Sequence, residues 1–213
     1  MMKGLQRVKK ASTARYENLK FIINKYKPKT ICEVGTEHGN GSVFMINEAL
    51  KHHDEIHFTG YDLFEGQTKE MNIKEKNGKG TTGSKVKPVP SLSALTNKLN
   101  KIKSSNPSFD FNLIKGNTNE TLKEDSFDLV FIDGGHSPET VENDYLKLKG
   151  SKVIVFDDYL LPERWWGANS VVEKYKLDIE FCPNYFYIDG TIKKGMAKKS
   201  TYQVYITNGV DSK

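Results

Sequence analysis

The stretch EVGTEHGNGS, residues 33 to 42, joins an apolar run to a helical pattern through a turn rich in glycine. The run that enters it, KTICEVG at 29 to 35, is short and apolar, which predicts a strand. Val43, Ile46 and Leu50 then recur at helical spacing and predict the next helix. A strand, a glycine turn and a helix in this order bring main-chain N–H groups against a ligand. The stretch therefore predicts a binding turn at the carboxyl end of a strand.

Strand and helix patterns alternate along most of the remaining chain. Further apolar runs predict strands at 56–64, 109–116, 127–133 and 153–158, and helical spacing recurs at 11–26, 92–102, 137–150 and 167–175. The aromatic runs at 184–190 and 201–209 have no helix between them and read as an antiparallel pair. This order predicts an α/β fold: a doubly wound, mainly parallel seven-stranded sheet with a C-terminal antiparallel hairpin.

Composition bounds the class of protein. The 213 residues, 37% of them hydrophobic, fit one domain over 1–213. No run reaches the roughly 18 apolar residues of a membrane span, and MMKGLQRVKK at the start lacks the apolar stretch of a signal peptide. Two cysteines give no disulfide framework. We therefore expect a cytoplasmic protein without a membrane partner.

The net charge of +5 arises from 32 basic and 27 acidic residues, and the lysines are scattered along the chain. Scattered lysines without interleaved aromatics argue against a nucleic-acid partner. The most basic stretch, 74–88, lies in a polar insert at about 65–90 that is rich in glycine and has no periodicity. We expect this insert to be a lid that closes over the site.

Polar side chains end the predicted parallel strands. Asp62 closes the second strand, Asn117 and Thr118 follow the third, and Asp133 ends the fourth. In a doubly wound sheet these carboxyl ends lie on the edge that binds ligands. An acid there can accept hydrogen bonds from ribose hydroxyls. Each of these side chains could also do no more than cap a turn.

The glycine turn resembles the first motif of class I S-adenosylmethionine-dependent methyltransferases, in the form E-x-G-x-x-x-G. It does not match the dinucleotide motif G-x-G-x-x-G, because Glu37 stands two residues after Gly35. The family also appends a hairpin to a parallel sheet. The resemblance implies S-adenosylmethionine as cofactor, with ribose at Asp62 and adenine at Asn117, where an amide replaces the acid common in the family. The implied cofactor-binding residues are Glu33, Gly35, Thr36, Gly39, Gly41, Ser42, Asp62, Asn117, Thr118 and Asp133.

FIDGGH at 131–136, followed by FDDY at 156–159, resembles the metal-dependent O-methyltransferases of the catechol and macrocin types. The resemblance implies that Asp133, Asp157 and Asp158 bind Mg²⁺ or another divalent cation, a hard ion that prefers oxygen ligands. A hydroxyl is a poor nucleophile until a cation lowers its pKa. It also implies that Asp133 and His136 are the catalytic residues, since a histidine can take the hydroxyl proton as general base.

The leading hypothesis is an O-methyltransferase that acts, with a divalent cation, on a hydroxyl of a small acceptor such as a sugar or a polyphenol. One alternative keeps the cofactor without the metal. Another is a non-catalytic module on the same fold that binds a nucleotide or a nucleic acid. The identity of the acceptor stays open. The oligomeric state stays open as well, and a homo-oligomer is one of the alternatives.

Overall fold

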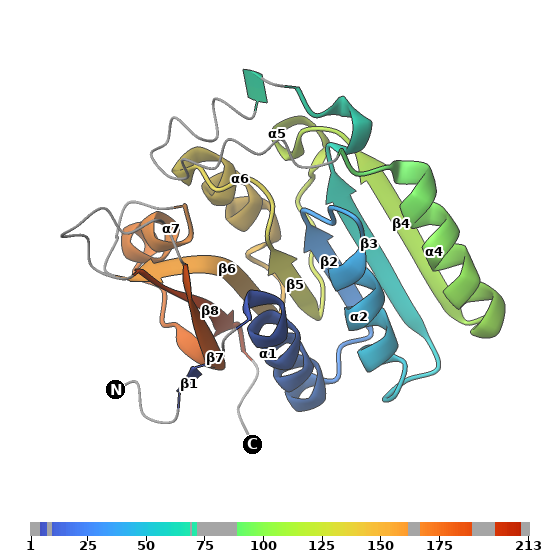
Figure 1. Ribbon diagram of the computed structural model, residues 1–213, viewed down its shortest axis with the longest axis horizontal. Helices are drawn as coiled ribbons and strands as arrows, with labels where there is room; N and C mark the ends of the chain where they lie inside the picture. Colours follow the sequence, from blue (N-terminus) through green and yellow to red (C-terminus); the bar gives the residue numbers. More distant parts are fainter. Residues whose placement is uncertain are drawn as a thin grey trace.

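A single mixed sheet carries the fold, between two layers of helices (Figure 1). The computed structural model describes residues 5–7, 10–68, 70–71, 89–161, 167–188 and 199–209. Within them the strands are β1 (Gln6–Arg7), β2 (Thr30–Val34), β3 (Ile56–Asp62), β4 (Phe109–Lys115), β5 (Leu129–Ile132), β6 (Val153–Leu161), β7 (Glu180–Ile188) and β8 (Lys199–Thr207). Their order in the sheet is β1-β7-β8-β6-β5-β2-β3-β4.

The five strands from β2 to β6 run parallel, and β8 lies antiparallel between β6 and β7. The predicted doubly wound sheet with a C-terminal antiparallel hairpin is therefore confirmed. The structure adds an eighth strand, because β1 pairs with β7 through two residues. So short a strand has no alternation for the sequence to reveal.

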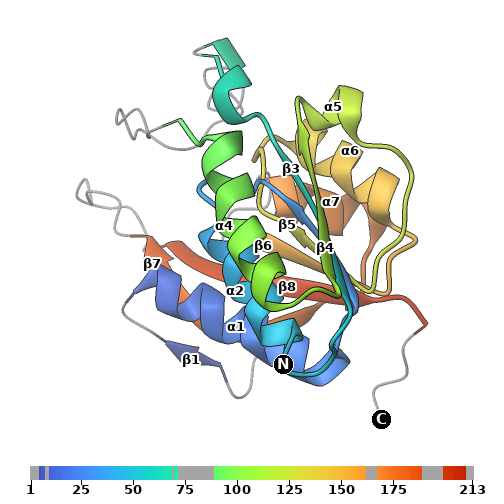
Figure 2. The same cartoon turned by 90° about the vertical axis from the view of Figure 1, so that its right-hand side faces the viewer.

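Helices cover both faces of this sheet, as the turned view in Figure 2 shows. One face carries α1 (Ala11–Tyr26), α2 (Asn40–Ala49) and α4 (Leu92–Ser105), and the other carries α6 (Pro138–Leu148) and α7 (Gly167–Tyr175). Each layer buries its own apolar cluster against the sheet, centred on residues such as Ile22 and Met45 on one face and Tyr145 and Val171 on the other. A buried stripe on each helix is what the helical spacing predicts.

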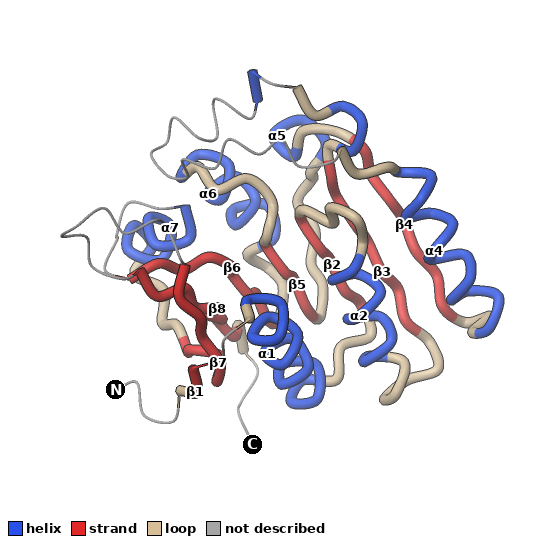
Figure 3. Tube along the Cα trace, in the orientation of Figure 1, coloured by secondary structure: helices blue, strands red, loops and turns tan. Residues whose placement is uncertain are grey.

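Short elements stand at the carboxyl edge of the parallel strands, near the top of Figure 3. They are the 3-10 helix η1 (Phe64–Gly66), just after β3, and α5 (Thr118–Thr121), just after β4. The predicted lid at 65–90 falls mostly outside the described residues, which omit 69 and 72–88, so it stays a prediction. None of the described helices is long and apolar enough to cross a membrane.

The winding of the sheet reverses at β2. From β2 the chain proceeds to β3 and β4 on one side, and it then crosses to β5 and β6 on the other side. The loops after β2 and β5 therefore leave the sheet in opposite directions. In open parallel sheets, ligands bind in the crevice outside the carboxyl ends of the strands at such a switch point.

Candidate active site

The glycine turn begins directly at the switch point. Gly35 has a φ of +90°, and its N–H donates to the Tyr61 carbonyl at 2.8 Å. A Cβ at this position would lie 2.2 Å from the Asp133 carbonyl oxygen. Gly35 is thus required because the ends of β2 and β5 pass so closely, and a side chain here would meet the protein's own backbone first.

Glu33 and Ser42 lie beneath this turn. Both are buried, and the Ser42 hydroxyl donates to the Glu33 carboxylate. Gly41 leaves room for the carboxylate, since a Cβ there would lie 2.6 Å from Glu33 Oε1. Burial raises the pKa of Glu33 to about 8; the Ser42 hydrogen bond opposes the shift and the charge of Asp62 adds to it. These predicted cofactor residues therefore support the turn from within.

Thr36 and Gly39 complete the turn. Thr36 is buried, and its carbonyl accepts from the Gly39 N–H at 2.7 Å. Gly39 has a φ of +75° and stands at the N-cap of α2. A Cβ on Gly39 would lie 2.1 Å from a methyl of Leu95 in α4. The turn is therefore packed against α4 and leads into the N-terminus of α2, where main-chain N–H groups are open to a ligand.

Asp62 links two loops at the end of β3. Its Oδ2 accepts from the Glu37 N–H at 2.7 Å, and its Oδ1 accepts from the Phe64 N–H at 2.8 Å. The capping role that the sequence allowed is therefore present. Each carboxylate oxygen can accept a further hydrogen bond, so a ribose diol fits the same side chain. Burial raises the pKa of Asp62, while the two main-chain donors oppose the shift.

Asn117 and Thr118 stand at the next strand end. Asn117 is the N-cap of α5, and its Oδ1 accepts from the Asn119 N–H at 3.1 Å. Thr118, the first residue of α5, is buried. The cap occupies the amide oxygen of Asn117, and its amide nitrogen is the atom that can donate to an adenine ring.

Asp133, Asp157 and Asp158 meet on the other side of the switch point. The Asp133 N–H donates to the Val34 carbonyl at 2.9 Å, which places Asp133 beside the glycine turn. β6 does not end at 158, as the sequence predicted, but continues to Leu161 through a β-bulge that contains both Asp157 and Asp158. Asp158 adopts a φ of +51° in this bulge. Bulges often redirect side chains next to active sites.

Arg15 of α1 reaches into this acidic group, and no sequence pattern singled it out. Its Nε lies 2.7 Å from Asp157 Oδ2, and its Nη2 donates to Asp158 Oδ1 at 3.0 Å. The neighbouring carboxylates raise the pKa of the guanidinium, although its burial opposes the shift. One weak signal exists in the sequence, because Arg15 is one of three arginines among 32 basic residues.

Asp133 and Asp157 are neighbours in the acidic group, and each carboxyl group affects the pKa of the other. Residue 133 is partly open to solvent, yet its carboxyl group is enclosed by protein atoms. Burial raises the pKa of Asp133 well above its ordinary value, with repulsion from Asp157 second. Burial also raises the pKa of Asp157, and Arg15 opposes that shift.

His136 completes the group from the loop between β5 and α6. Its Nε2 lies 3.6 Å from Asp158 Oδ2, and 39% of its side chain is exposed. The His136 carbonyl accepts from the Gly167 N–H at 3.1 Å, which ties this loop to the start of α7. The four predicted residues of the acidic half of the site are thus brought together.

The structure does not confirm the predicted cation site at the three aspartates. In the part of the chain that the structure describes, no group of three or more His, Cys, Asp or Glu side chains is placed to hold a metal ion. Asp157 Oδ2 and Asp158 Oδ1 contact Arg15, and Asp158 Oδ2 lies 3.6 Å from His136 Nε2. The positive charge among the aspartates is the guanidinium of Arg15.

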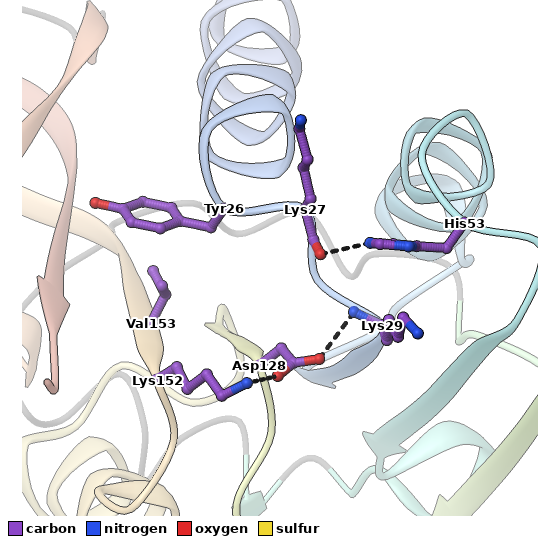
Figure 4. A pocket seen from close by; sticks show the side chains of 7 residues that line it. All are labelled: Tyr26, Lys27, Lys29, His53, Asp128, Lys152 and Val153. Carbon is purple, nitrogen blue, oxygen red and sulfur yellow. Dashed lines mark hydrogen bonds and ion pairs between the residues drawn. The ribbon is translucent and has the colours of Figure 1, made fainter. Parts of the chain in front are cut away.

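A separate hollow lies at the opposite edge of the sheet, where β2, β5 and β6 begin (Figure 4). Its polar groups bind one another. Asp128 accepts from the Lys29 N–H at 2.9 Å and pairs with Lys152 Nζ at 2.6 Å, and His53 Nε2 lies 2.8 Å from the Lys27 carbonyl. This hollow contains none of the predicted site residues.

The strand order, the inserted antiparallel β8 and the glycine turn at the switch point define the class I methyltransferase fold. A family profile described as a methyltransferase domain matches residues 32–159, and the chain belongs to this family. The predicted enzyme class, an S-adenosylmethionine-dependent methyltransferase, is confirmed at this level. A search among curated proteins finds no match.

Solved structures share the fold at low sequence identity. The O-methyltransferase NovP has a TM-score of 0.57 and 14% identity over 91% of this chain and 79% of its own. TomG from Streptomyces achromogenes, an O-methyltransferase, has a TM-score of 0.52 and 13% identity over 92% and 80%. Precorrin-6y C5,15-methyltransferase from Geobacter metallireducens has a TM-score of 0.52 and 15% identity over 90% and 88%.

Proposed function

We propose that this chain transfers the methyl group of S-adenosylmethionine to a hydroxyl of a small acceptor such as a sugar or a polyphenol. The observation that carries the proposal is the position of His136 and three aspartates beside the glycine turn, across the switch point from Asp62. A cofactor on one side and proton-accepting groups on the other side are what transfer to a hydroxyl needs.

The cofactor half fits S-adenosylmethionine. The turn after β2 offers main-chain N–H groups at the start of α2, and Asp62 keeps lone pairs for a ribose diol. TomG, which shares the fold, was solved in complex with S-adenosylmethionine. Precorrin-6y C5,15-methyltransferase shares the fold as well, so the choice of an oxygen acceptor depends on the acidic half of the site.

When bound, S-adenosylmethionine supplies a methyl group on a sulfonium, which the acceptor oxygen takes while sulfur keeps the electron pair of the broken bond. The protein must remove the hydroxyl proton as the new oxygen–carbon bond forms. The His136 imidazole is partly exposed and can accept that proton. Asp158, 3.6 Å away, stabilises the imidazolium that results.

The divalent cation of the leading hypothesis stays a prediction. The steps above use only His136 and Asp158, so none of them requires a cation, and two of the aspartates that would bind it contact Arg15. Of the two versions that keep the cofactor, this arrangement favours the one without a metal. Activity that survives dialysis against EDTA would support this version.

The test is methyl transfer to a panel of sugars and polyphenols, with the methyl ether and S-adenosylhomocysteine measured by mass spectrometry. We expect His136→Ala to lower the chemical step by something on the order of 10²-fold to 10⁴-fold, the usual contribution of a positioned base. Higher pH should restore part of this loss, because hydroxide can replace the base. Cofactor affinity should stay the same.

His57→Ala is the matched control, because His57 is an exposed histidine of β3 that lies beside Glu55, away from the site. It should leave the rate unchanged. Binding of S-adenosylmethionine without turnover on any acceptor would instead favour a non-catalytic module. Equal rates in the two histidine variants would remove His136 from the mechanism.

A further inference from the structure

Arg15 lies on the side of α1 that faces the protein, and 32% of its side chain is exposed. It shares that side of the helix with Asn18, Leu19 and Ile22, all of which are buried. Asn18 fixes the helix on the hairpin, since its Nδ2 donates to the Asn184 carbonyl at 2.9 Å and its Oδ1 accepts from the Asn184 N–H at 2.9 Å. Arg15, one turn earlier, is therefore directed at the bulge of β6.

The guanidinium takes the space that a cation on Asp157 would need. A Mg²⁺ ion bound to a carboxylate lies about 2.1 Å from the oxygen. Arg15 Nε lies 2.7 Å from Asp157 Oδ2, and the Asp157 side chain is 1% exposed. An ion on that oxygen would have to share a buried space with a permanent positive charge, which repels it strongly where water is scarce.

The contact is also of a kind that arginine serves and lysine does not. Two nitrogens of one guanidinium contact the carboxylates of two successive residues, Asp157 and Asp158. A planar fork can hold both carboxylates in one orientation, whereas an ammonium is a single point charge. The orientation matters because Asp158 also faces His136.

We infer that Arg15 is the resident cation of this site: it stands in the place of a divalent ion, positions Asp157 and Asp158, and makes the site independent of metal. The catalytic consequence rests on the function proposed above, whereas the exclusion of metal does not. Arg15 lies outside residues 32–159, so the family match does not include it.

The direct test is binding of Mn²⁺, followed by electron paramagnetic resonance without cofactor or acceptor. Wild-type protein should bind no more Mn²⁺ than Asp157→Asn. Arg15→Met removes the charge and keeps an apolar stem, so it should bind Mn²⁺ at least about 100-fold more tightly than wild type, because a buried repulsion is gone. Arg15→Lys should exclude Mn²⁺ as wild type does, because it keeps the positive charge. Lys20→Met, an exposed change on α1, should behave as wild type.

Circular dichroism should first establish that each variant is folded, and Arg15→Met combined with Asp157→Asn gives a second folded background if the single variant is unstable. The double variant should lose the Mn²⁺ binding that Arg15→Met gains. Mn²⁺ binding by wild type that Asp157→Asn abolishes would overturn the inference, and so would a folded Arg15→Met that binds none. If the wild-type protein transfers no methyl group to any acceptor, the proposed function is refuted, but the Mn²⁺ result still stands.

Discussion

At the scale of single residues, Glu33 is the clearest case of a group held in an unusual state. It is 2% exposed, it accepts from the Ser42 hydroxyl, and it lies against Gly41. Burial raises its pKa to about 8 from an ordinary value of 4.5. Near neutral pH the folded protein therefore keeps a proton on Glu33 that the unfolded chain has released.

This difference predicts a pH dependence of stability. Between pH 4.5 and about 8 the folded state binds the extra proton, so the free energy of unfolding should fall as the pH rises through this window. The slope is at most about 1.4 kcal/mol per pH unit for one proton. Glu33→Gln keeps the shape without the titration and should flatten this part of the profile in urea unfolding.

Glu173→Gln, on the exposed side of α7, should leave the slope as it is in wild type. An unchanged slope in Glu33→Gln would mean that Glu33 ionises in the folded protein at its ordinary pKa.

At the scale of elements, the position of α1 determines where Arg15 meets Asp157 and Asp158 in the acidic half of the site. Asn18 makes three hydrogen bonds to Asn184 of β7, and both residues are buried. Replacing Asn18 with Leu would leave the main-chain N–H and C=O of Asn184 without these partners. Each buried polar group that loses its partner costs about 1–3 kcal/mol.

We therefore expect Asn18→Leu to lower the free energy of unfolding by about 3 kcal/mol in urea unfolding. Asn24→Leu is the control, because Asn24 is exposed on the same helix and its Oδ1 lies 2.8 Å from Nε2 of the partly exposed His52. It should change stability by less than about 0.5 kcal/mol. Equal losses in the two variants would show that Asn18 does not anchor α1.

The elements were largely predictable because their signals are local. Apolar runs and helical spacing predict strands and helices within a few residues of their observed ends, and alternation predicts the parallel sheet. The pairing of Arg15 with Asp158 joins positions 143 residues apart, and it depends on how α1 docks on the hairpin. Helical spacing says which face of α1 is buried but not what that face meets. The sequence therefore predicted that the three aspartates lie together, but it did not predict that Arg15 pairs with two of them.

The roles of the glycines were only partly predictable for the same reason. The motif predicted that Gly35 admits a ligand, but the atom nearest to a Cβ there is the carbonyl of Asp133, which is 98 residues away in the chain. A motif gives the residue types at a turn, while the close approach of β2 and β5 is a property of the assembled sheet. Gly41 likewise leaves room for the buried carboxyl group of Glu33.

At the scale of the whole molecule, an aspartate that accepts hydrogen bonds from two main-chain N–H groups lies at the carboxyl edge of the sheet, and another lies at the opposite edge. Asp62 at the carboxyl edge accepts from the N–H groups of Glu37 and Phe64. Asp128 at the opposite edge accepts from those of Lys29 and Thr30. Both aspartates hold two main-chain donors, but only Asp62 lies beside the switch point. Variants of these two aspartates therefore distinguish a loss of ligand binding from a loss of loop stability.

Because S-adenosylhomocysteine should bind the folded protein alone, it should raise the midpoint of thermal unfolding, by the equivalent of about 2.7 kcal/mol at one hundred times its dissociation constant. Asp62→Ala and Asp128→Ala should both lower the midpoint without ligand, since each frees two main-chain N–H groups. With ligand, Asp128→Ala should gain as much as wild type, whereas Asp62→Ala should lose most of the gain, because the ribose has lost its acceptor. Differential scanning calorimetry measures both effects. A full gain in Asp62→Ala, or its loss in Asp128→Ala, would move the cofactor away from the carboxyl edge.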